Sequence, residues 1–364
     1  MSGRRTGPGS ADAAPPDFEE RLDELRGQAE REGRVDAPGV KAVGGPVPDT
    51  RATGAGGPVP ASGATAAGRP VRDAGGEGAG YYGRPALQAP VWTWEIPVYF
   101  FVGGIAGSSA VIAWAARLTG AGVELQRVAL WVSLACTVAS AVLLIFDLGR
   151  PARFLHMLRV FKWRSPMSVG VWVISAFGCF VTLAVIGIEL IAQGADSGLA
   201  VVLTTLGTWG AAPLGAIVAT YTGVLIGATV VPAWNLHRGT LPLHFGIAGF
   251  GSAAAVLELW GFQIEALWML GLLAASVETL VGLTIELDRN GAADRALRAG
   301  SAGTMLRGSG LLAGPVSLVL RMVGFTQLAA ISFLVGSLVS RFGWLNAGRA
   351  SARDPEAALE RYSG

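Results

Sequence analysis

Residues 96–116 read IPVYFFVGGIAGSSAVIAWAA and contain no charged side chain. As an α-helix, about 20 apolar residues cross the roughly 30 Å hydrocarbon core of a bilayer, so this stretch predicts a membrane-spanning helix. Six further apolar stretches of comparable length follow it. They lie at 128–146, 168–192, 211–232, 241–260, 266–286 and 317–341. The sequence therefore predicts an all-α, polytopic transmembrane helical bundle with seven clear spans.

The composition supports this prediction. Hydrophobic residues make up 51% of the 364 residues and charged residues only 15%, against about a quarter charged in an ordinary soluble domain, which argues against a water-soluble enzyme. All 11 Trp follow position 90, and most are at predicted span ends, as in the aromatic belts of membrane proteins. Small residues recur four apart in several spans, such as Gly103 and Gly107, which allows close helix packing in lipid.

Residues 1–90 form a separate, Gly/Pro-rich tail. They hold 18 of the 52 Gly and 11 of the 19 Pro, so we expect this tail to be disordered apart from a short helix at 17–34. Its nearly balanced charge argues against a nucleic-acid-binding arm. No apolar run precedes position 96, so we expect no cleavable signal peptide. The predicted organisation is this tail, a transmembrane domain at 91–348 and a C-terminal tail at 349–364.

The basic residues predict an orientation. The connections after the second, fourth and sixth spans carry most of the arginine, whereas the opposite connections carry little beyond Arg117 and Arg127. The positive-inside rule therefore favours a multi-pass protein of the cell membrane with a cytoplasmic N-terminus and, by parity, an external C-terminus. An eighth helix would return the C-terminus. Residues 199–234, which are long for one helix, and 306–320, which Gly and Pro interrupt, are the two places that could hold an extra helical piece.

Polar residues gather just after the second span. Residues 147–156, DLGRPARFLH, contain Asp147, Arg150, Arg153 and His156. They could simply cap a helix and fix topology, or they could form a surface for partner docking or proton transfer.

Two tyrosines lie where a flat, lipid-soluble ligand could bind. Trp94, Glu95 and Tyr99 lie at the start of the first span beside Gly103, and Glu95 and Tyr99 share a helix face. Tyr221 lies within the fourth span, where its phenol needs a hydrogen-bond partner, either a neighbouring backbone group or a bound ligand.

Glu278 lies near the middle of the sixth span, where an unpaired carboxylate is costly. We consider two alternatives for it: an ion pair with Arg321 of the seventh span, and a proton relay. Glu189, Glu258 and Glu265 lie near span ends and are expected to reach water.

The chain has few ligands for redox metals. Its two cysteines, Cys136 and Cys179, cannot supply the four thiolates of an iron–sulfur cluster. Its three histidines do not form the axial pair of a transmembrane haem, so any electron-carrying metal is expected on another subunit.

Five segments in order resemble the NrfD/PsrC family, the membrane subunits of polysulfide reductases. They are 94–107 (WEIPVYFFVGGIAG), 147–155 (DLGRPARFL), 165–170 (SPMSVG), 221–225 (YTGVL) and 231–234 (VPAW). The resemblance implies an integral membrane subunit of a respiratory oxidoreductase that binds quinone or quinol, either menaquinone or ubiquinone. It also implies a ferredoxin-like partner subunit with four-iron clusters and, in many complexes, a molybdopterin subunit.

The resemblance also implies site residues. Tyr99, preceded by Glu95, and Tyr221 match the family's quinone positions, with Trp94 and Gly103 beside them. Asp147, Arg150, Arg153 and His156 are implied as a partner-docking or proton-transfer surface. The alternatives are a secondary transporter, which would use Glu278 and Arg321 but would require a repeat between the halves that we do not see, and a passive membrane anchor.

Overall fold

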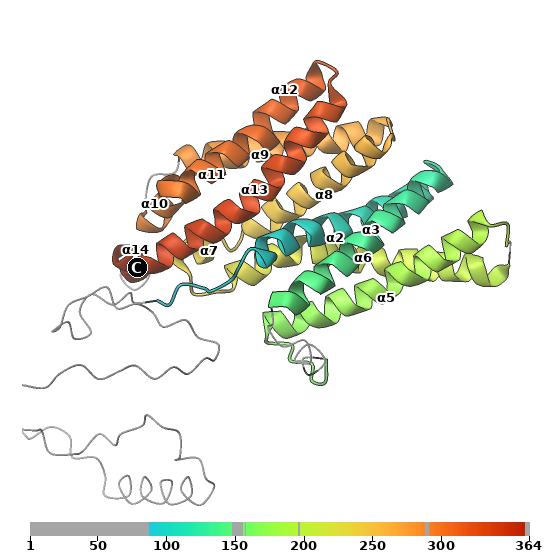
Figure 1. Cartoon of the computed structure of the whole chain (residues 1–364), viewed down its shortest axis with the longest axis horizontal. Helices are drawn as coiled ribbons and strands as arrows, with labels where there is room; N and C mark the ends of the chain where they lie inside the picture. Colours follow the sequence, from blue (N-terminus) through green and yellow to red (C-terminus); the bar gives the residue numbers. More distant parts are fainter. Residues whose placement is uncertain (1–86, 148–155, 157, 196, 288–290, 361–364) are drawn as a thin grey trace, which may run out of the picture. The chain divides into compact units, whose positions relative to one another are not determined.

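The computed structural model describes residues 87–147, 156, 158–195, 197–287 and 291–360 (Figure 1). In this described part, every regular element is helical. The predicted helix at 17–34, most of the predicted tail, and Arg150 and Arg153 lie outside these residues.

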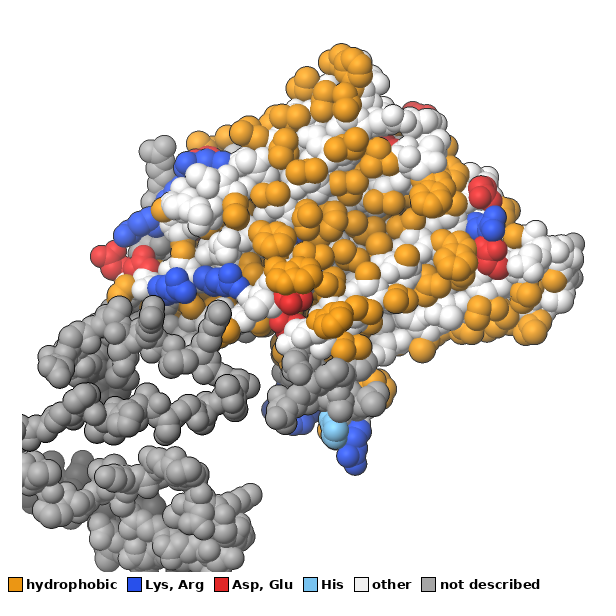
Figure 2. Space-filling view, in the orientation of Figure 1, with side chains coloured by type: hydrophobic (Ala, Val, Ile, Leu, Met, Phe, Trp, Pro, Cys, Tyr) orange, Lys and Arg blue, Asp and Glu red, His pale blue; other side chains and the backbone are white. Residues whose placement is uncertain are grey.

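Seven helices of the described part are long and apolar enough to cross a membrane, which confirms the predicted polytopic all-α bundle. They are α2 (Glu95–Thr119), α3 (Val123–Asp147), α5 (Pro166–Ala192), α6 (Gly198–Gly227), α8 (Leu241–Trp260), α9 (Glu265–Leu287) and α13 (Thr326–Arg353). On the face drawn in Figure 2, hydrophobic side chains cover the helices and charged side chains gather toward their ends, as a lipid environment requires. The chain is a multi-pass membrane protein.

Two predicted spans have different bounds in the structure. Helix α6 begins at Gly198 rather than at 211, because Pro213 is accommodated within the helix and does not end it. The last span does not run over 317–341. A separate helix, α12 (Ser317–Met322), ends before a turn at Gly324, and α13 then continues to Arg353.

The region around 306–320 forms an eighth crossing. Helix α11 (Gly300–Leu311), the π-helical segment η1 (Leu312–Val316) and α12 follow one another, with a kink where Gly314 precedes Pro315. Helix α13 returns antiparallel beside all three (Figure 1). Ser317 donates to the carbonyl of Ala329, while Leu306 packs against Gly343 near the other end.

This crossing corrects the predicted position of the C-terminus. The end of α13 lies beside the residues that lead into α2, because Arg349 and Arg353 line the same depression as Trp92 and Trp94. Within the described residues, both ends of the bundle are therefore at the N-terminal face, defined here as the face where α2 begins. Parity with seven spans was wrong, because the kinked crossing is too interrupted to be recognised from hydropathy.

The eight crossings form two groups of four. The first group contains α2, α3, α5 and α6, and the second contains α8, α9, the α11–η1–α12 crossing and α13. The predicted small-residue faces hold them together: a methyl group on Gly107 of α2 would overlap the backbone of Gly215 and Ala219 in α6. Short helices, among them α7 (Pro232–Leu236), α10 (Ala292–Arg298) and α14 (Pro355–Glu360), lie at the N-terminal face.

The close approach at Gly107 generates a prediction about stability. Gly107→Ala should destabilise the protein by about 1–3 kcal/mol, because the added methyl group has no room between α2 and α6. Gly282→Ala is the matched control, since a methyl group on Gly282 meets no atom within 4 Å. Thermal unfolding of the detergent-solubilised variants measures the difference. Equal melting temperatures would contradict the tight packing of α2 on α6.

Candidate functional site

A cleft opens at the N-terminal face of the first helix group and is called the α2 cleft. It lies between the start of α2, the end of α3, the start of α5 and the end of α6, and its cavity volume is about 90 Å³. Its lining residues are Trp92, Ile96, Tyr99, Phe100, Leu144, Asp147, Met167, Gly170, Val171, Ile174, Tyr221 and Leu225.

Tyr99 and Tyr221 both line this cleft, as the sequence predicts for two residues of one site. Tyr99 is only 5% exposed, and its hydroxyl has no hydrogen-bond partner among the described residues. The Tyr221 hydroxyl donates to the backbone carbonyl of Pro166 at the start of α5. Of the two partners considered for Tyr221, the structure shows the backbone group. Gly170 is required beside it, because any side chain there would overlap the Tyr221 ring.

Asp147 is the third polar residue of the α2 cleft. It is the last residue of α3 and lies at the cleft wall with Leu144. His156 is exposed and is not among the lining residues. The structure therefore brings only Asp147 of the predicted loop cluster to the cleft, because Arg150 and Arg153 lie outside the described residues.

Three predicted quinone residues are near the cleft but do not line it. Trp94 is 61% exposed and faces the neighbouring depression that contains Arg349. Glu95 accepts a hydrogen bond from the hydroxyl of Thr93. Gly103 lies one helical turn beyond Tyr99 and leaves room for its ring.

An aromatic residue that sequence reasoning placed only in the interfacial belt closes the cleft. Trp92 stacks on Trp234, with ring centroids 5.5 Å apart and an interplanar angle of 10°, and lies edge-on to Phe100. The indole nitrogen of Trp234 donates to the carbonyl of Trp344 at 2.8 Å. Trp234 belongs to one of the segments that carry the family resemblance, and Trp92 lies just before another. Their stacking could not be predicted from the sequence, because it depends on contacts between the two helix groups.

The second helix group contains buried charges whose pairing differs from the prediction. Arg321 pairs with Glu258, not with Glu278, through two hydrogen bonds of 2.6 and 2.7 Å. Glu258 does not reach water, because both side chains are about 1% exposed. Arg321 is near the C-terminal end of α12, at the level where α8 ends. The predicted pair assumed that 317–341 is one helix, which gave Arg321 the wrong depth.

Glu278 belongs to a different cluster. Its carboxylate oxygen lies 3.4 Å from Nδ1 of His244, and the indole nitrogen of Trp344 donates to Nε2 of the same histidine at 3.3 Å. Arg341 lies over the ring of Phe245 at 3.7 Å and donates to the carbonyl of that residue. All four polar side chains of this cluster come from the N-terminal half of α8, the middle of α9 and the C-terminal half of α13.

Charges near the opposite face are arranged differently. Arg127 at the start of α3 makes a bidentate pair with Glu189 near the end of α5, at 2.6 and 2.9 Å, and Trp131 donates to the same carboxylate. This pair is partly exposed, in agreement with the expectation that Glu189 lies near water. In the described residues, no three His, Cys, Asp or Glu side chains lie close enough to hold a metal ion.

The comparison with known proteins now bears on this geometry. The family model described as "Polysulphide reductase, NrfD" matches residues 85–276. The chain belongs to this family. The match covers α2 to α8 and part of α9, and so includes all four helices that form the α2 cleft. As a family member, the chain is a membrane subunit of a respiratory oxidoreductase. None of the curated proteins matches the chain.

The buried ion pair yields a prediction. Glu258→Gln should destabilise the protein by about 3–5 kcal/mol, because it leaves the Arg321 guanidinium buried without a counter-charge. Glu286→Gln breaks a pair of the same chemistry with Arg307, but those side chains are 42% and 49% exposed, and we expect at most about 1 kcal/mol. Chemical or thermal unfolding of both variants in the same detergent checks the contrast. Similar losses would show that the burial of Glu258 is not what matters.

Proposed function

We propose that the chain exchanges electrons between the membrane quinone pool and an iron–sulfur partner subunit, with quinone or quinol bound in the α2 cleft. The observation that carries this proposal is the convergence of Tyr99, Tyr221 and Asp147, from three different helices, on one apolar cleft at a membrane face. Family membership supports it, because NrfD proteins generally interact with quinones.

The cleft fits such a ligand chemically. Its walls are mainly apolar, as a lipid-soluble ring requires, and its polar groups are few and convergent. The Tyr99 phenol is almost completely buried and has no hydrogen-bond partner in the described residues, so a ligand carbonyl oxygen would satisfy it. Reduction of a quinone to a quinol takes up two electrons and two protons.

The residues of the cleft divide the work of binding and proton transfer. Tyr99 donates a hydrogen bond to one ligand oxygen and orients the ring. Tyr221 is held by the Pro166 carbonyl and supports the opposite wall. Asp147, at the end of α3 on the N-terminal face, accepts or delivers protons between the cleft and water. Three further residues do not line the cleft but help to position α2 at its edge: Trp94, Glu95 and Gly103.

The electron partner is a ferredoxin-like subunit with four-iron clusters, and a molybdopterin subunit completes the complex. NrfD proteins generally associate with subunits of these kinds. The partner docks at the N-terminal face beside Asp147 and His156, where electrons have the shortest route to the α2 cleft. Arg150 and Arg153, which lie outside the described residues, are assigned to the same docking role from the sequence. Glu278 contributes to proton transfer from its own buried cluster beside His244, whereas Arg321 neutralises the Glu258 carboxylate in a separate cluster.

The N-terminal face is cytoplasmic and the protein is in the cell membrane. The described basic residues at this face include Arg159, Lys162, Arg238, Arg295 and Arg298, whereas the opposite face carries chiefly Arg117 and Arg127. In this orientation, the residues that lead into α2 and the end of α13 are both at the cytoplasmic surface.

A secondary transporter is the second candidate. The kink at Gly314 and Pro315 and the buried charges favour it. A transporter would move its solute without an iron–sulfur partner, and a passive anchor would bind the partner without quinone. Purification with an iron–sulfur subunit and bound quinone separates the proposed function from both.

Replacement of the two tyrosines tests the proposed function directly. In the assembled complex, Tyr99→Phe should lower quinone-dependent kcat/KM by about 10- to 100-fold, because a ligand oxygen loses its hydrogen-bond donor. Tyr221→Phe should have a smaller effect, because its hydroxyl already donates to Pro166. Thr182→Val, which removes a lipid-facing hydroxyl on α5, is the control. Unchanged turnover in both tyrosine variants would remove the α2 cleft from the mechanism.

Labelling tests the orientation. In a variant without Cys136 and Cys179, Ser10→Cys and Ser363→Cys should both be protected from a membrane-impermeant maleimide in intact cells. Ala121→Cys, in the exposed turn between α2 and α3, should react. The opposite pattern would invert the orientation, and protection of only one terminus would contradict the eighth crossing.

A further inference from the structure

The two helix groups contain related sequences at their first helices. From Ile96 the first helix reads IPVYFFVGG, and from Leu241 helix α8 reads LPLHFGIAG. In this ungapped alignment, proline, phenylalanine and the last glycine are identical, and Tyr99 of α2 corresponds to His244 of α8. The span pattern and the motifs reveal no repeat between the halves, and this short correspondence is confined to the nine residues at the two helix starts.

The structure supports the correspondence independently. The rings of Phe100 and Phe245, which are equivalent in the alignment, lie 6.1 Å apart. The equivalent glycines Gly104 and Gly249 also meet, because a methyl group on Gly249 would come within 3.0 Å of the Gly104 carbonyl oxygen. Contact between equivalent residues is what an approximate two-fold axis between the groups produces.

A second cleft occupies the corresponding place in the second group and is called the α8 cleft. It lies between the start of α8 and the end of α9, as the α2 cleft lies between the start of α2 and the end of α3, and its cavity volume is about 380 Å³. Its outer wall is open to lipid, since Leu243 and Leu280 are 63% and 60% exposed. A ligand would therefore enter from the membrane.

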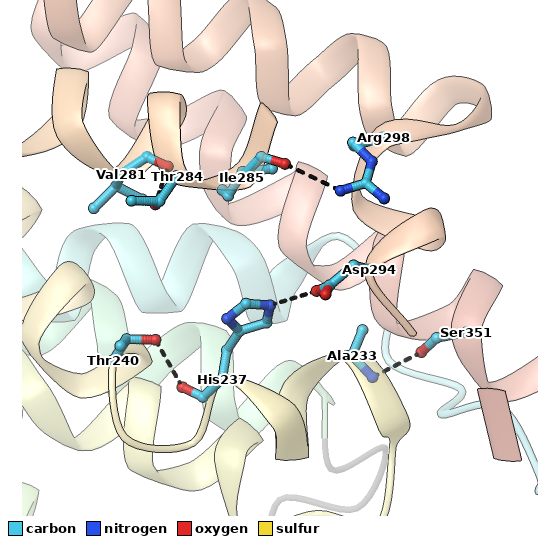
Figure 3. A network of polar contacts seen from close by, with 9 residues as sticks. All are labelled: Ala233, His237, Thr240, Val281, Thr284, Ile285, Asp294, Arg298 and Ser351. Atoms are coloured by element: carbon cyan, nitrogen blue, oxygen red, sulfur yellow. Dashed lines mark hydrogen bonds and ion pairs between the residues drawn. The ribbon is translucent and has the colours of Figure 1, made fainter. Parts of the chain in front are cut away.

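The polar groups of the α8 cleft are few and lie at one end. The Nε2 atom of His237 lies 3.0 Å from the Asp294 carboxylate, and Thr240 donates to the His237 carbonyl. Figure 3 shows His237 and Thr240 facing Val281, Thr284 and Ile285 of α9, with Asp294 beside the histidine. When Nε2–H donates to Asp294, Nδ1 of His237 remains as an acceptor, and in the protonated ring it becomes a donor.

A buried histidine nitrogen in this cleft makes no hydrogen bond. His244 is 5% exposed, and its Nδ1 makes no hydrogen bond, although the Glu278 carboxylate lies 3.4 Å away. Its other nitrogen accepts from Trp344, which also lines the cleft. A ring that carries oxygen atoms, bound at this end of the cleft, would satisfy the remaining nitrogens of His237 and His244.

We infer that the α8 cleft is a second binding site for a quinone or quinol, separate from the α2 cleft. The inference goes beyond the proposed function and shares with it only the class of ligand. Three observations support this occupant: the lipid-facing wall, the donor and acceptor nitrogens of His237 and His244, and the equivalence of His244 with Tyr99. A free anion would have no access through the apolar wall, and the nearest carboxylates, Asp294 and Glu278, would repel it.

Binding stoichiometry tests the inference without any measurement of turnover. The full-length protein in nanodiscs is titrated with decylubiquinone and, separately, with a menaquinone that has one isoprene unit. Binding is followed by quenching of tryptophan fluorescence and by extraction of bound quinone. We expect two equivalents for the unmodified protein.

Variants that fill each cleft assign the two equivalents. Thr284→Phe places a ring in the α8 cleft and should remove one equivalent, whereas Leu273→Phe, a lipid-facing change elsewhere on α9, should leave two. Met167→Trp fills the α2 cleft and should remove the other equivalent. His237→Phe, which keeps the ring but removes the nitrogens, should weaken one class of site by at least 10-fold, and unchanged melting temperatures confirm that the variants are folded.

The outcomes separate this inference from the proposed function. If the protein binds one equivalent of quinone, and that equivalent is lost in Met167→Trp but kept in Thr284→Phe, the second site is overturned and the α2 cleft is supported. One equivalent with the reverse pattern supports the α8 cleft and argues against the α2 cleft. Loss of a bound phospholipid in Thr284→Phe, with quinone binding unchanged, shows that a lipid occupies the cleft and overturns the inference.

Discussion

Helix α2 is held by close backbone approach on two sides, and the rest of the bundle depends on it. Gly107 meets the backbone of α6, and Gly104 meets Gly249 of α8. In lipid, apolar helices gain little from hydrophobic burial against one another, so shape complementarity at small residues determines which helices associate. Accordingly, α2 is the most buried of the seven long helices of the described part. These contacts, together with those to α3 and α13, fix α2 in the bundle and so position Tyr99.

The two groups use different polar groups at equivalent places. In the first group, Tyr99 and Tyr221 present hydroxyls, and the backbone carbonyl of Pro166 at the start of α5 accepts a hydrogen bond from Tyr221. In the second group, His244 and Arg341 are surrounded by Glu278, Trp344 and the Phe245 ring. A buried cation in a membrane requires a carboxylate or an aromatic face nearby, and this requirement explains why the second group carries several buried charges. The first group needs no such compensation and is packed mainly through small and apolar residues.

Much of the fold could be predicted because a bilayer imposes strong rules on sequence. The length of apolar runs gave the seven helices, and local motifs gave Tyr99, Tyr221 and Asp147, which do meet at one cleft. The partners of Glu258 and Arg321 could not be predicted, since they depend on the register of α12 against α8 and on the kink at Gly314. The repeat was hidden for a related reason: only short stretches at the helix starts are similar, and equivalence becomes evident only when Phe100 and Phe245 are seen in contact.

The two clefts are joined by one set of aromatic contacts. Trp92 lines the α2 cleft and stacks on Trp234, whose indole nitrogen donates to the backbone of Trp344, a residue of the α8 cleft. Trp234 is completely buried between them, and Gly348 of α13 leaves the space that its ring needs. Packed interiors respond to a changed side chain by shifting neighbours together, so a substitution at Trp234 would disturb both clefts. The two clefts can therefore be altered one at a time only at their outer walls. Met167 lines the α2 cleft alone, and Thr284 lines the α8 cleft alone. The central tryptophans support both clefts.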